Sequence, residues 1–382
     1  MNSNNLYERY HRQIILPEFG EEGQQKLLKA KVLVIGAGGL GCPALQYLTA
    51  AGIGTIGIVD FDVVEESNLQ RQVIFDINDI GKPKAEAAQK KLQALNPYIQ
   101  VNIHPVRLTS ANAMDLLREY DVIADGSDNF PTRYLVNDAC VLLNKPLVYG
   151  SILQFEGQIS VFNCLKKEGG RNPNYRDLYP TPPRPGEIPD CAEAGVLGVL
   201  PGIIGSMQAA EVIKLITHIG EPLAGKLFLF NALDFSTRIL NFKPDENNPL
   251  TGKYPTIKEL INYTDFCNFE PTKPNNRMKE ITPAELKTKM DNKDDFQLID
   301  VREDYEYDIA NLGGELIPLG NILQETARIS KDKMVVIHCK AGGRSGTAII
   351  ELEKRFGFTN LYNLKGGILA YSKEVDASIP TY

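Results

Sequence analysis

Residues 31–41 read Lys31-Val-Leu-Val-Ile-Gly-Ala-Gly-Gly-Leu-Gly41 and join a strand pattern to a glycine-rich turn. The first five form a continuous apolar, β-branched run, which is typical of a parallel strand covered on both faces. Gly36, Gly38 and Gly41 then follow the spacing G-x-G-x-x-G, and residues 43–51 have a helical pattern. Such a turn lets a phosphate approach the free N–H groups of a helix N-terminus. The stretch therefore predicts a strand, a phosphate-binding loop and a helix.

The residues that follow continue the alternation of strands and helices. Strands are predicted at 54–59, 99–104 and 122–124, and helices at 82–95 and 111–119. Alternation at this spacing is typical of a doubly wound, mostly parallel sheet with helices on both faces. We therefore expect an α/β protein whose first domain has a Rossmann-like sheet.

Composition and charge exclude several classes of protein. The chain has 382 residues, 43% of them hydrophobic and 23% charged, with a net charge of −7. Its length predicts two domains, and its acidity argues against nucleic-acid binding, which needs a basic face. The N-terminus has no signal-peptide core, and the longest apolar stretch, 194–210, is interrupted by Pro201. We read that stretch as buried and expect no membrane association.

The six cysteines are scattered along the chain without any Cys-x-x-Cys pair. This pattern argues against a disulfide framework and favours a reducing cytoplasm. Cys42, Cys140 and Cys164 lie in apolar periodic segments, so we interpret them as buried and inert.

Two breaks divide the chain. Proline-rich residues within 169–189 predict a long irregular loop, and a polar stretch with prolines covers 262–279. We place the domain boundary in the second break, which gives a first domain at 1–265, a linker at 266–277 and a second domain at 278–382. The second domain has short strands predicted at 296–301, 334–338 and 361–363, separated by helical stretches, and is a smaller α/β domain.

The nucleotide suggested by the glycine-rich turn is specified by charged residues after it. Asp60 ends the second strand and could bind ribose hydroxyls, which fits nicotinamide dehydrogenases equally well. Arg71 and Lys84 add two cations, as a triphosphate requires for its β and γ charges. Asp128 follows a strand end, where a single carboxylate suits Mg²⁺. The alternative is that Arg71, Lys84 and Asp128 are surface charges.

Five ordered motifs together resemble the ubiquitin-activating superfamily, and most closely its bacterial adenylyltransferases for the sulfur carriers of molybdopterin and thiamine synthesis. They are Arg9-Tyr-His-Arg-Gln13, Gly36-Ala-Gly-Gly-Leu-Gly41, Asp60-Phe-Asp62, Ser67-Asn-Leu-Gln-Arg-Gln72 and Ser127-Asp-Asn129. The resemblance covers residues 6–250. It implies ATP and Mg²⁺ as cofactors, with Asp128 as the metal ligand. The implied nucleotide-site residues are Gly36, Gly38, Gly39, Gly41, Asp60, Asp62, Asn68, Arg71, Gln72, Lys84 and Asp128.

The resemblance also implies partners. The substrate would be the C-terminal carboxylate of a small ubiquitin-like sulfur carrier, with the small subunit of molybdopterin synthase preferred. The thiamine-pathway carrier is the next alternative, and a carrier of cysteine synthesis or tRNA thiolation remains open. Arg12 would reach into the site of a partner subunit, which implies a homodimer.

Cys191 and a missing metal site mark differences within this family. Cys191 follows the proline-rich loop among polar residues, and its implied role is a covalent intermediate with the carrier; a passive loop cysteine is the alternative. Many members bind structural zinc through two Cys-x-x-Cys pairs. The first pair would fall within 173–177 and the second after Asn248-Pro249, but Asn174, Asp177 and residues 250–253 include no thiol. We therefore expect no structural zinc.

Cys339 lies between a predicted strand and a helix expected from about Thr347, in Cys339-Lys-Ala-Gly-Gly-Arg344. Loop N–H groups and the helix N-terminus would stabilise its thiolate. This loop, with Leu298-Ile-Asp-Val-Arg302 and Leu364-Lys-Gly-Gly-Ile368, resembles the rhodanese active site over residues 278–380. Cys339 would carry a persulfide and Arg344 would add charge. A cysteine phosphatase, whose loop has one residue more, and a buried core cysteine are the alternatives.

Together the two domains predict successive reactions. The first would adenylate the carrier, and the second would deliver sulfur from Cys339, received from a donor such as a cysteine desulfurase or thiosulfate, to form a thiocarboxylate. A nicotinamide oxidoreductase and an inactive scaffold for a ubiquitin-like partner are the alternatives from other classes.

Overall fold

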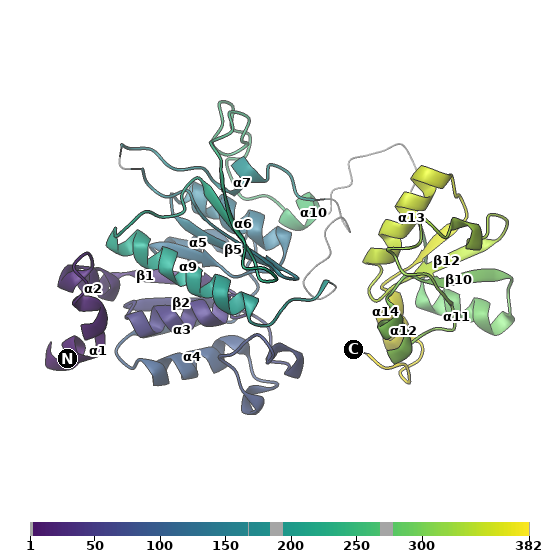
Figure 1. Cartoon of the computed structure of the whole chain (residues 1–382), viewed down its shortest axis with the longest axis horizontal. Coiled ribbons are helices and arrows are strands. Elements are labelled where there is room, and N and C mark those ends of the chain that lie inside the picture. Colours follow the sequence, from purple (N-terminus) through teal and green to yellow (C-terminus); the bar gives the residue numbers. More distant parts are fainter. Residues whose placement is uncertain (1–2, 167, 184–193, 268–277, 382) are drawn as a thin grey trace. The chain divides into compact units, whose positions relative to one another are not determined.

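A computed structural model describes residues 3–166, 168–183, 194–267 and 278–381, without the side chains of residues 3–7. The chain folds into two compact units, each built on its own sheet (Figure 1). The first unit contains α1 to α10 with β1 to β8, and the second contains β9 to β13 with α11 to α14. Within the described ranges, no helix is long and apolar enough to cross a membrane.

The sheet of the first unit has the strand order β3-β2-β1-β4-β5-β6-β7-β8. Strands β3, β2, β1, β4 and β5 are parallel, and β6, β7 and β8 extend the sheet in antiparallel fashion. The predicted mostly parallel sheet is confirmed, and the antiparallel extension adds to it. The strands are β1 (Lys31–Ile35), β2 (Thr55–Val59), β3 (Gln100–His104), β4 (Val122–Asp125), β5 (Leu147–Leu153), β6 (Glu156–Phe162), β7 (Lys226–Asn231) and β8 (Thr237–Asn241).

Helices cover both faces of this sheet and enclose two apolar cores. Along β1, Val32 and Val34 belong to the core beneath α3, α4 and α9, whereas Leu33 and Ile35 belong to the core beneath α5 and α6. This alternation follows from the two-residue period of a strand covered on both faces. The helices are α1 (Ser3–Ile14), α2 (Gly20–Lys29), α3 (Gly41–Ala51), α4 (Lys84–Leu95), α5 (Ala113–Arg118), α6 (Phe130–Leu142), α7 (Tyr175–Leu178), α9 (Leu200–Thr217) and α10 (Tyr263–Cys267), with short 3₁₀ turns at Glu66–Asn68 and Ile77–Asp79.

The apolar stretch predicted to be buried at 194–210 enters α9 at Leu200 and packs on the sheet from there, whereas Leu197 and Val199 before the helix are exposed. Pro201 stands at the beginning of this helix, where its missing N–H costs no hydrogen bond. Pro201 therefore starts a helix here instead of interrupting one. The loop predicted at 169–189 also differs, because residues within it form the short helix α7.

The sheet of the second unit is parallel throughout, in the order β11-β10-β12-β13-β9. Its two faces carry separate cores, with Val335 and Ile337 on one and Val336 on the other. The elements are β9 (Lys279–Ile281), α11 (Pro283–Asn292), β10 (Phe296–Asp300), α12 (Asp304–Ile309), β11 (Glu315–Leu316), a 3₁₀ turn (Thr326–Arg328), β12 (Met334–His338), α13 (Gly343–Phe356), β13 (Leu361–Leu364) and α14 (Gly367–Glu374).

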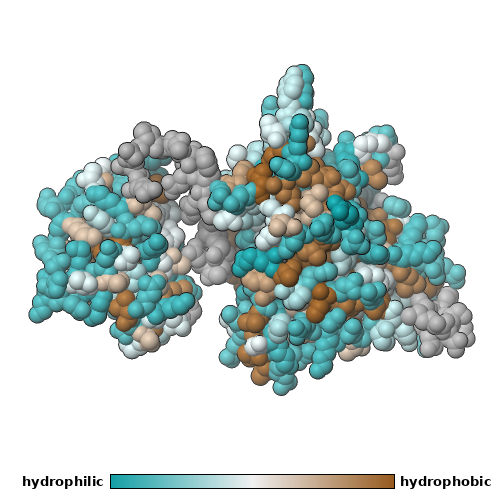
Figure 2. All heavy atoms as spheres, turned by 180° about the vertical axis from the view of Figure 1, so that it is seen from behind, coloured by the Kyte–Doolittle hydropathy of each residue, from teal (hydrophilic) through white to brown (hydrophobic). Residues whose placement is uncertain are grey.

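On the face drawn in Figure 2, apolar side chains gather in patches on the larger unit, and the smaller unit is mostly polar. Exposed apolar side chains of the larger unit include Leu233, Phe235, Ile239 and Leu240 in the hairpin of β7 and β8.

Candidate active sites

A cavity of about 970 Å³ lies at the carboxyl ends of β1, β2 and β4. The sheet order places β2 on one side of β1 and β4 on the other, so this is the point where the strand order reverses. Ligands of open α/β sheets bind at such points, in pockets of about 300–1,000 Å³. The predicted residues that line this cavity are Gly36, Gly38, Gly39, Asp60, Asp62, Arg71, Gln72, Lys84 and Asp128.

The glycines of the loop have different physical roles. A methyl group placed on Gly41 would lie 1.9 Å from the carbonyl oxygen of Gly36, so close packing of helix and strand requires glycine there. A methyl group on Gly38 would meet nothing nearer than the side-chain nitrogen of Gln72, at 4.0 Å. The fold therefore does not require glycine at 38, and its missing side chain leaves cavity volume open beside the loop.

Asp60 connects this loop to the end of β2. Its two carboxylate oxygens accept hydrogen bonds from the N–H groups of Ala37, at 2.7 Å, and Asp62, at 2.9 Å. Burial raises the pKa of Asp60, although these hydrogen bonds and the charge of Lys84 act against it. The carboxylate thus holds the glycine-rich loop in place and still lines the cavity.

Two cations stand beside the cavity. The ammonium of Lys84, on a buried side chain, lies 3.4 Å from a carboxylate oxygen of Asp62. Arg71 lines the cavity and donates a hydrogen bond to the carbonyl of Ser67 at 3.0 Å. The amide oxygen of Gln72 is buried without a hydrogen-bond partner among the described residues. These groups fit a ligand that is anionic and also offers a donor.

Asp128 follows β4 as an exposed carboxylate that lines the cavity. One of its oxygens accepts a hydrogen bond from the amide of Asn129 at 3.3 Å, and Asn129 caps α6 through the N–H of Thr132. In the described ranges, no cluster of three or more His, Cys, Asp or Glu side chains could hold a metal ion. A single carboxylate suits Mg²⁺, which keeps several of its waters.

Two of the predicted nucleotide-site residues, Gly41 and Asn68, do not line the cavity, and neither does Arg12, which was predicted to reach a partner subunit's site. Gly41 acts in packing, as its contact with Gly36 shows. Asn68 is buried and accepts a hydrogen bond from the N–H of Glu65 at 3.2 Å, which caps a 3₁₀ turn. Arg12 is exposed near the end of α1, away from the cavity of its own chain.

Sequence reasoning missed other lining residues. The guanidinium of Arg107 lies 3.9 Å from the centre of the Phe61 ring, and both residues line the cavity. Arg133 also lines it and is 3.5 Å from the carbonyl of Ser127. Residues 260–264 line the cavity as well. Phe61 lies within the motif Asp60-Phe-Asp62. By contrast, no sequence motif marks Arg107, Arg133 or residues 260–264 as part of a binding site.

A hydrogen-bonded network joins the two segments in which the resemblance implies thiol pairs. The amide of Asn174 donates to the hydroxyl of Thr251 and to a carboxylate oxygen of Asp177, each at 3.0 Å. The amide of Asn248 donates to the other oxygen of Asp177 at 2.7 Å. We call Asn174, Asp177, Asn248 and Thr251 the polar clamp. It joins α7 to the segment after β8 with oxygen and nitrogen groups alone.

A buried ion pair lies next to the polar clamp. Arg176 makes two hydrogen bonds to Asp138, at 2.7 and 2.8 Å, and both side chains are almost completely buried. The hydroxyl of Tyr263 donates to the same carboxylate at 2.8 Å. Asp138, on α6, therefore holds both α7 and α10.

The structure describes four cysteines of the first unit, and one of them, Cys267 on α10, is a buried free thiol. Cys42, Cys140 and Cys164 are buried, free thiols, which confirms that part of the prediction. Burial raises the pKa of Cys42 to about 12. Cys191 lies outside the described residues, so its role stays a prediction.

In the second unit, Cys339 follows β12 and is buried. Its sulfur accepts a hydrogen bond from the N–H of Gly342 at 3.1 Å and lies 3.4 Å from the hydroxyl of Ser345. Helix α13 begins at Gly343, four residues before the predicted position, because Gly342 turns the chain with a φ of +99°. The thiol thus faces backbone N–H groups at a helix N-terminus.

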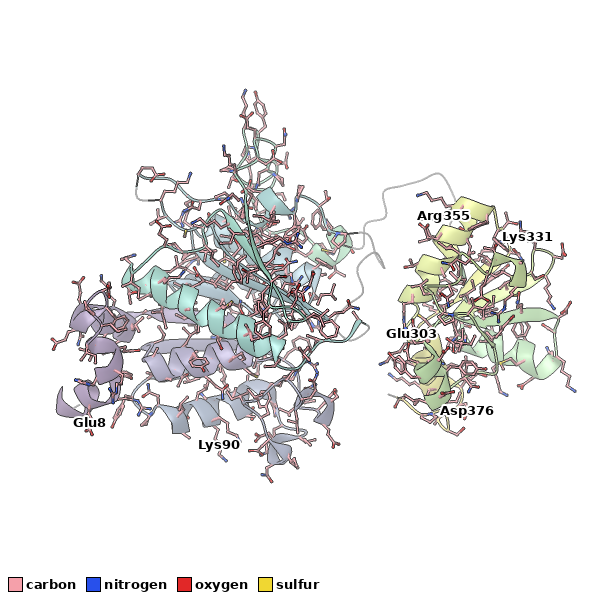
Figure 3. All side chains as sticks on the ribbon, in the orientation of Figure 1. Glu8, Lys90, Glu303, Lys331, Arg355 and Asp376 are labelled. Atoms are coloured by element: carbon pink, nitrogen blue, oxygen red, sulfur yellow. The ribbon has the colours of Figure 1, made fainter. Side chains whose placement is uncertain are left out.

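Arg344 is paired with a carboxylate of α12. Its two terminal nitrogens lie 2.5 and 2.7 Å from the oxygens of Glu306, which is 5% exposed. Glu306 also accepts a hydrogen bond at 3.1 Å from the N–H of Glu303, labelled in Figure 3 at the beginning of α12. The charge predicted for Arg344 is therefore balanced within the described structure.

His338 precedes Cys339 and is completely buried. Its side chain lies 3.7 Å from Asp300, which makes a buried ion pair with Arg302. Burial lowers the pKa of His338 to about 4, against the opposing effect of Asp300. His338 is therefore neutral at physiological pH.

The fold and the two sites define a Rossmann-type nucleotide-binding protein joined to a domain with a cysteine in a helix-opening loop. Residues 10–251 match the ThiF family, and residues 282–374 match the rhodanese-like domain. The chain belongs to the ThiF family and carries a rhodanese-like domain after it. These matches confirm the predicted fold class and family.

Curated relatives extend the match along the chain. A probable adenylyltransferase/sulfurtransferase MoeZ of Mycobacterium tuberculosis is 48% identical over 379 residues, or 98% of this chain and 95% of that protein. The adenylyltransferase and sulfurtransferase MOCS3 of Drosophila grimshawi is 40% identical, over 100% of this chain and 87% of its own length. A sulfur carrier protein adenylyltransferase of Thermus thermophilus is 56% identical, over 68% of this chain and 96% of its own. These names agree with the predicted enzyme class.

Among solved structures, MccB of E. coli with ATP superposes with a TM-score of 0.57 at 24% identity, over 66% of this chain and 75% of that chain. This likeness concerns the fold alone.

Proposed function

We propose that this chain is an ATP-dependent adenylyltransferase for the C-terminal glycine of a ubiquitin-like sulfur carrier, and that its rhodanese-like domain supplies sulfur from a persulfide on Cys339. The observation that carries the first part is that Arg71, Lys84 and Asp128 line one cavity with the glycine-rich loop. Three unrelated surface charges would not be expected to line the same cavity as a phosphate-binding loop. The names of the relatives support the second part.

The residues of the cavity divide the work of binding ATP. Gly38 leaves space for phosphate beside the N–H groups that open α3, and Asp60 is placed to accept hydrogen bonds from ribose. Arg71 and Lys84 offset the phosphate charge. Asp128 would hold Mg²⁺, which when bound offsets charge on the leaving pyrophosphate.

Adenylation needs positioning more than proton transfer. A carboxylate is already ionised at neutral pH, so one of its oxygens can attack the α-phosphorus without a general base. A bond forms between that oxygen and phosphorus, and the bond to the β-phosphate bridge breaks. Pyrophosphate leaves with the electron pair, and the carrier becomes an acyl-adenylate. Arg71 and Lys84 stabilise the negative charge of the leaving pyrophosphate.

Sulfur transfer then uses the second unit. The terminal sulfur of a Cys339 persulfide attacks the acyl carbon, AMP leaves, and an acyl disulfide forms. Attack of a second thiol on the Cys339 sulfur breaks the sulfur–sulfur bond, releases the thiocarboxylate and leaves a disulfide, which a cellular dithiol reduces. We propose Cys191 as a thiol that takes part between these steps. A cysteine desulfurase or thiosulfate recharges Cys339.

The remaining predictions stand as parts of this proposal. The carrier is the small subunit of molybdopterin synthase, with the thiamine-pathway carrier as the alternative. The enzyme works as a cytoplasmic homodimer in which exposed Arg12 reaches the partner's site. The domains span 1–265 and 278–382.

Carrier-dependent exchange of radioactive pyrophosphate into ATP tests adenylation. The full chain is assayed with Mg²⁺ and each purified carrier, beside Asp128→Ala and a control, Asp115→Ala, which changes an exposed carboxylate on α5 outside the cavity. We expect exchange with one carrier that needs its intact Gly-Gly terminus, at least a hundredfold less in Asp128→Ala, and unchanged in the control. Absence of exchange with every carrier contradicts the proposal.

Mass spectrometry of the carrier tests sulfur transfer. With thiosulfate as donor, the wild type should convert the carboxylate to a thiocarboxylate, and Cys339→Ala should stop at the adenylate. If Cys339→Ala formed as much thiocarboxylate as the wild type, the second unit would not be the source of the sulfur.

A further inference from the structure

Residues 252–267, which we call the connector, lie after the ThiF match and before the rhodanese-like match. They form the last stretch of the first unit, although the polar break at 262–279 would suggest a simple linker. Their contacts indicate otherwise. Leu260 and Ile261 pack on the core beneath α5 and α6, and Tyr263 is buried within it.

Two hydrogen bonds fasten the connector at separate points. The hydroxyl of Ser110, in the loop after β3, donates to the carbonyl of Ile261 at 2.5 Å. The hydroxyl of Tyr263 donates to Asp138 on α6 at 2.8 Å. Asn262 accepts from the N–H groups of Thr264 and Asp265 and caps α10. The connector is therefore anchored on both sides of Asn262.

Between these anchors the connector lines the nucleotide cavity. Residues 260–264 share its wall with Gly38, Asp60 and Asp128, and with residues 106–111, which include Ser110. Because β3 is the neighbour of β2, the loop after β3 lies on the side of the cavity where β2 ends in Asp60. The connector thus meets the cavity on the side expected to hold the ribose.

We propose that residues 260–264 of the connector are part of the ATP-binding site, so that the site extends beyond the ThiF match into the segment that leads to the rhodanese-like domain. This inference rests on the proposed function, because it takes ATP as the ligand. Bound ATP contacts residues 260–264 and stabilises the docked conformation of the connector, in which Ile261 and Tyr263 make their hydrogen bonds to the rest of the first unit. By thermodynamic reciprocity, a docked connector binds ATP more tightly.

The variant Leu260→Ala, made in the full chain, tests whether residues 260–264 contribute to ATP binding. Binding of ATP with Mg²⁺ is measured by isothermal titration calorimetry, beside Lys258→Ala, an exposed connector residue outside the cavity. We expect the dissociation constant to rise roughly five- to tenfold in Leu260→Ala and to stay unchanged in Lys258→Ala. Thermal unfolding checks that each variant is folded.

Hydrogen exchange of the wild type gives a second measurement that needs no variant. Saturating ATP with Mg²⁺ should slow exchange of amides 260–266, while the exposed strand β8 should exchange as before. Equal affinity in Leu260→Ala, or unchanged exchange at 260–266 while ATP binds, would overturn the inference and leave the proposed function standing. A wild type that does not bind ATP contradicts the proposed function itself.

Discussion

The side-chain amide of Asn174 donates a hydrogen bond to the hydroxyl of Thr251, 3.0 Å away and 77 residues further along the chain. Asn174 and Asp177 are three residues apart, and so are Asn248 and Thr251. This is the spacing of two Cys-x-x-Cys pairs. The polar clamp therefore joins the two segments in which the resemblance implies pairs of zinc-binding thiols.

The polar clamp should be sensitive to loss of its central carboxylate. Asp177 accepts hydrogen bonds from both clamp amides and from the N–H groups of Asn174 and Asp245. Asp177→Ala leaves these donors unsatisfied and should lower the free energy of unfolding of the first unit by about 2–3 kcal/mol. Thr251→Val removes one acceptor and should cost about 1 kcal/mol. Urea unfolding measures both.

A chelator supplies the control for this prediction. Because the polar clamp has no thiol, EDTA should leave the unfolding midpoint of the wild type unchanged. A fall in the midpoint, or zinc in the purified protein by metal analysis, would contradict it.

Gly38 and Gly41 should respond differently to alanine. Gly38→Ala meets no protein atom closer than 4.0 Å, so stability should be unchanged, but the methyl group enters the cavity and should weaken ATP binding about tenfold or more. Gly41→Ala collides with the carbonyl of Gly36 and should lower the melting temperature. Calorimetric titration and thermal unfolding separate the two effects. Equal ATP affinity in Gly38→Ala would mean that phosphate binds elsewhere.

Ser345 should position a proton for the sulfur of Cys339. Its hydroxyl lies 2.6 Å from the amide oxygen of Asn363 and 3.4 Å from the sulfur, so it can turn from one acceptor to the other when the sulfur is ionised. Ser345→Ala should shift the pH profile of sulfur transfer from thiosulfate to cyanide upward by roughly half to one unit. Ser378→Ala, an exposed serine, is the matched control. Superimposable profiles would assign Ser345 a packing role only.

Buried His338 should make the second unit sensitive to acid. Its pKa is about 4 in the folded chain and 6.5 in the unfolded chain, so the unfolded state binds the proton first. Stability is therefore complete above pH 6.5 and falls between 6.5 and 4, by on the order of 3 kcal/mol. Pulsed hydrogen exchange along a urea gradient, read on β12, measures this loss. His338→Asn should flatten this pH dependence of stability, and an equally steep dependence in the variant would mean that His338 does not cause it.

The sequence predicts the elements whose signal is local. The apolar run of β1, the glycine turn and α3 are contiguous, and β12 has the predicted bounds. By contrast, every side chain of β8 is exposed, so hydrophobic alternation cannot indicate it. Helix α7 has a local capping box of Asn174 and Asp177 but is only four residues long, and the burial of Arg176 against Asp138 is a tertiary contact that the sequence does not indicate.

For the cavity of the first unit, too, the sequence predicts the residues that lie in local motifs and not those brought in by tertiary contacts. Residues in family motifs, such as Asp60 and Asp128, line the cavity as expected. Arg107 does not stand out in the sequence, because its partner Phe61 lies in another loop. The connector is polar in composition, yet buried Tyr263 anchors it, and a hydrogen bond across 125 residues leaves no local pattern.

The hydrogen bond between Tyr263 and Asp138 also determines when the first unit can finish folding during translation. Until residue 263 has left the ribosome, Asp138 lacks one of its hydrogen bonds and the nucleotide cavity lacks one wall. The roughly hundred residues that follow take on the order of ten seconds to translate. In that interval the first unit can complete its fold before the second unit has been made.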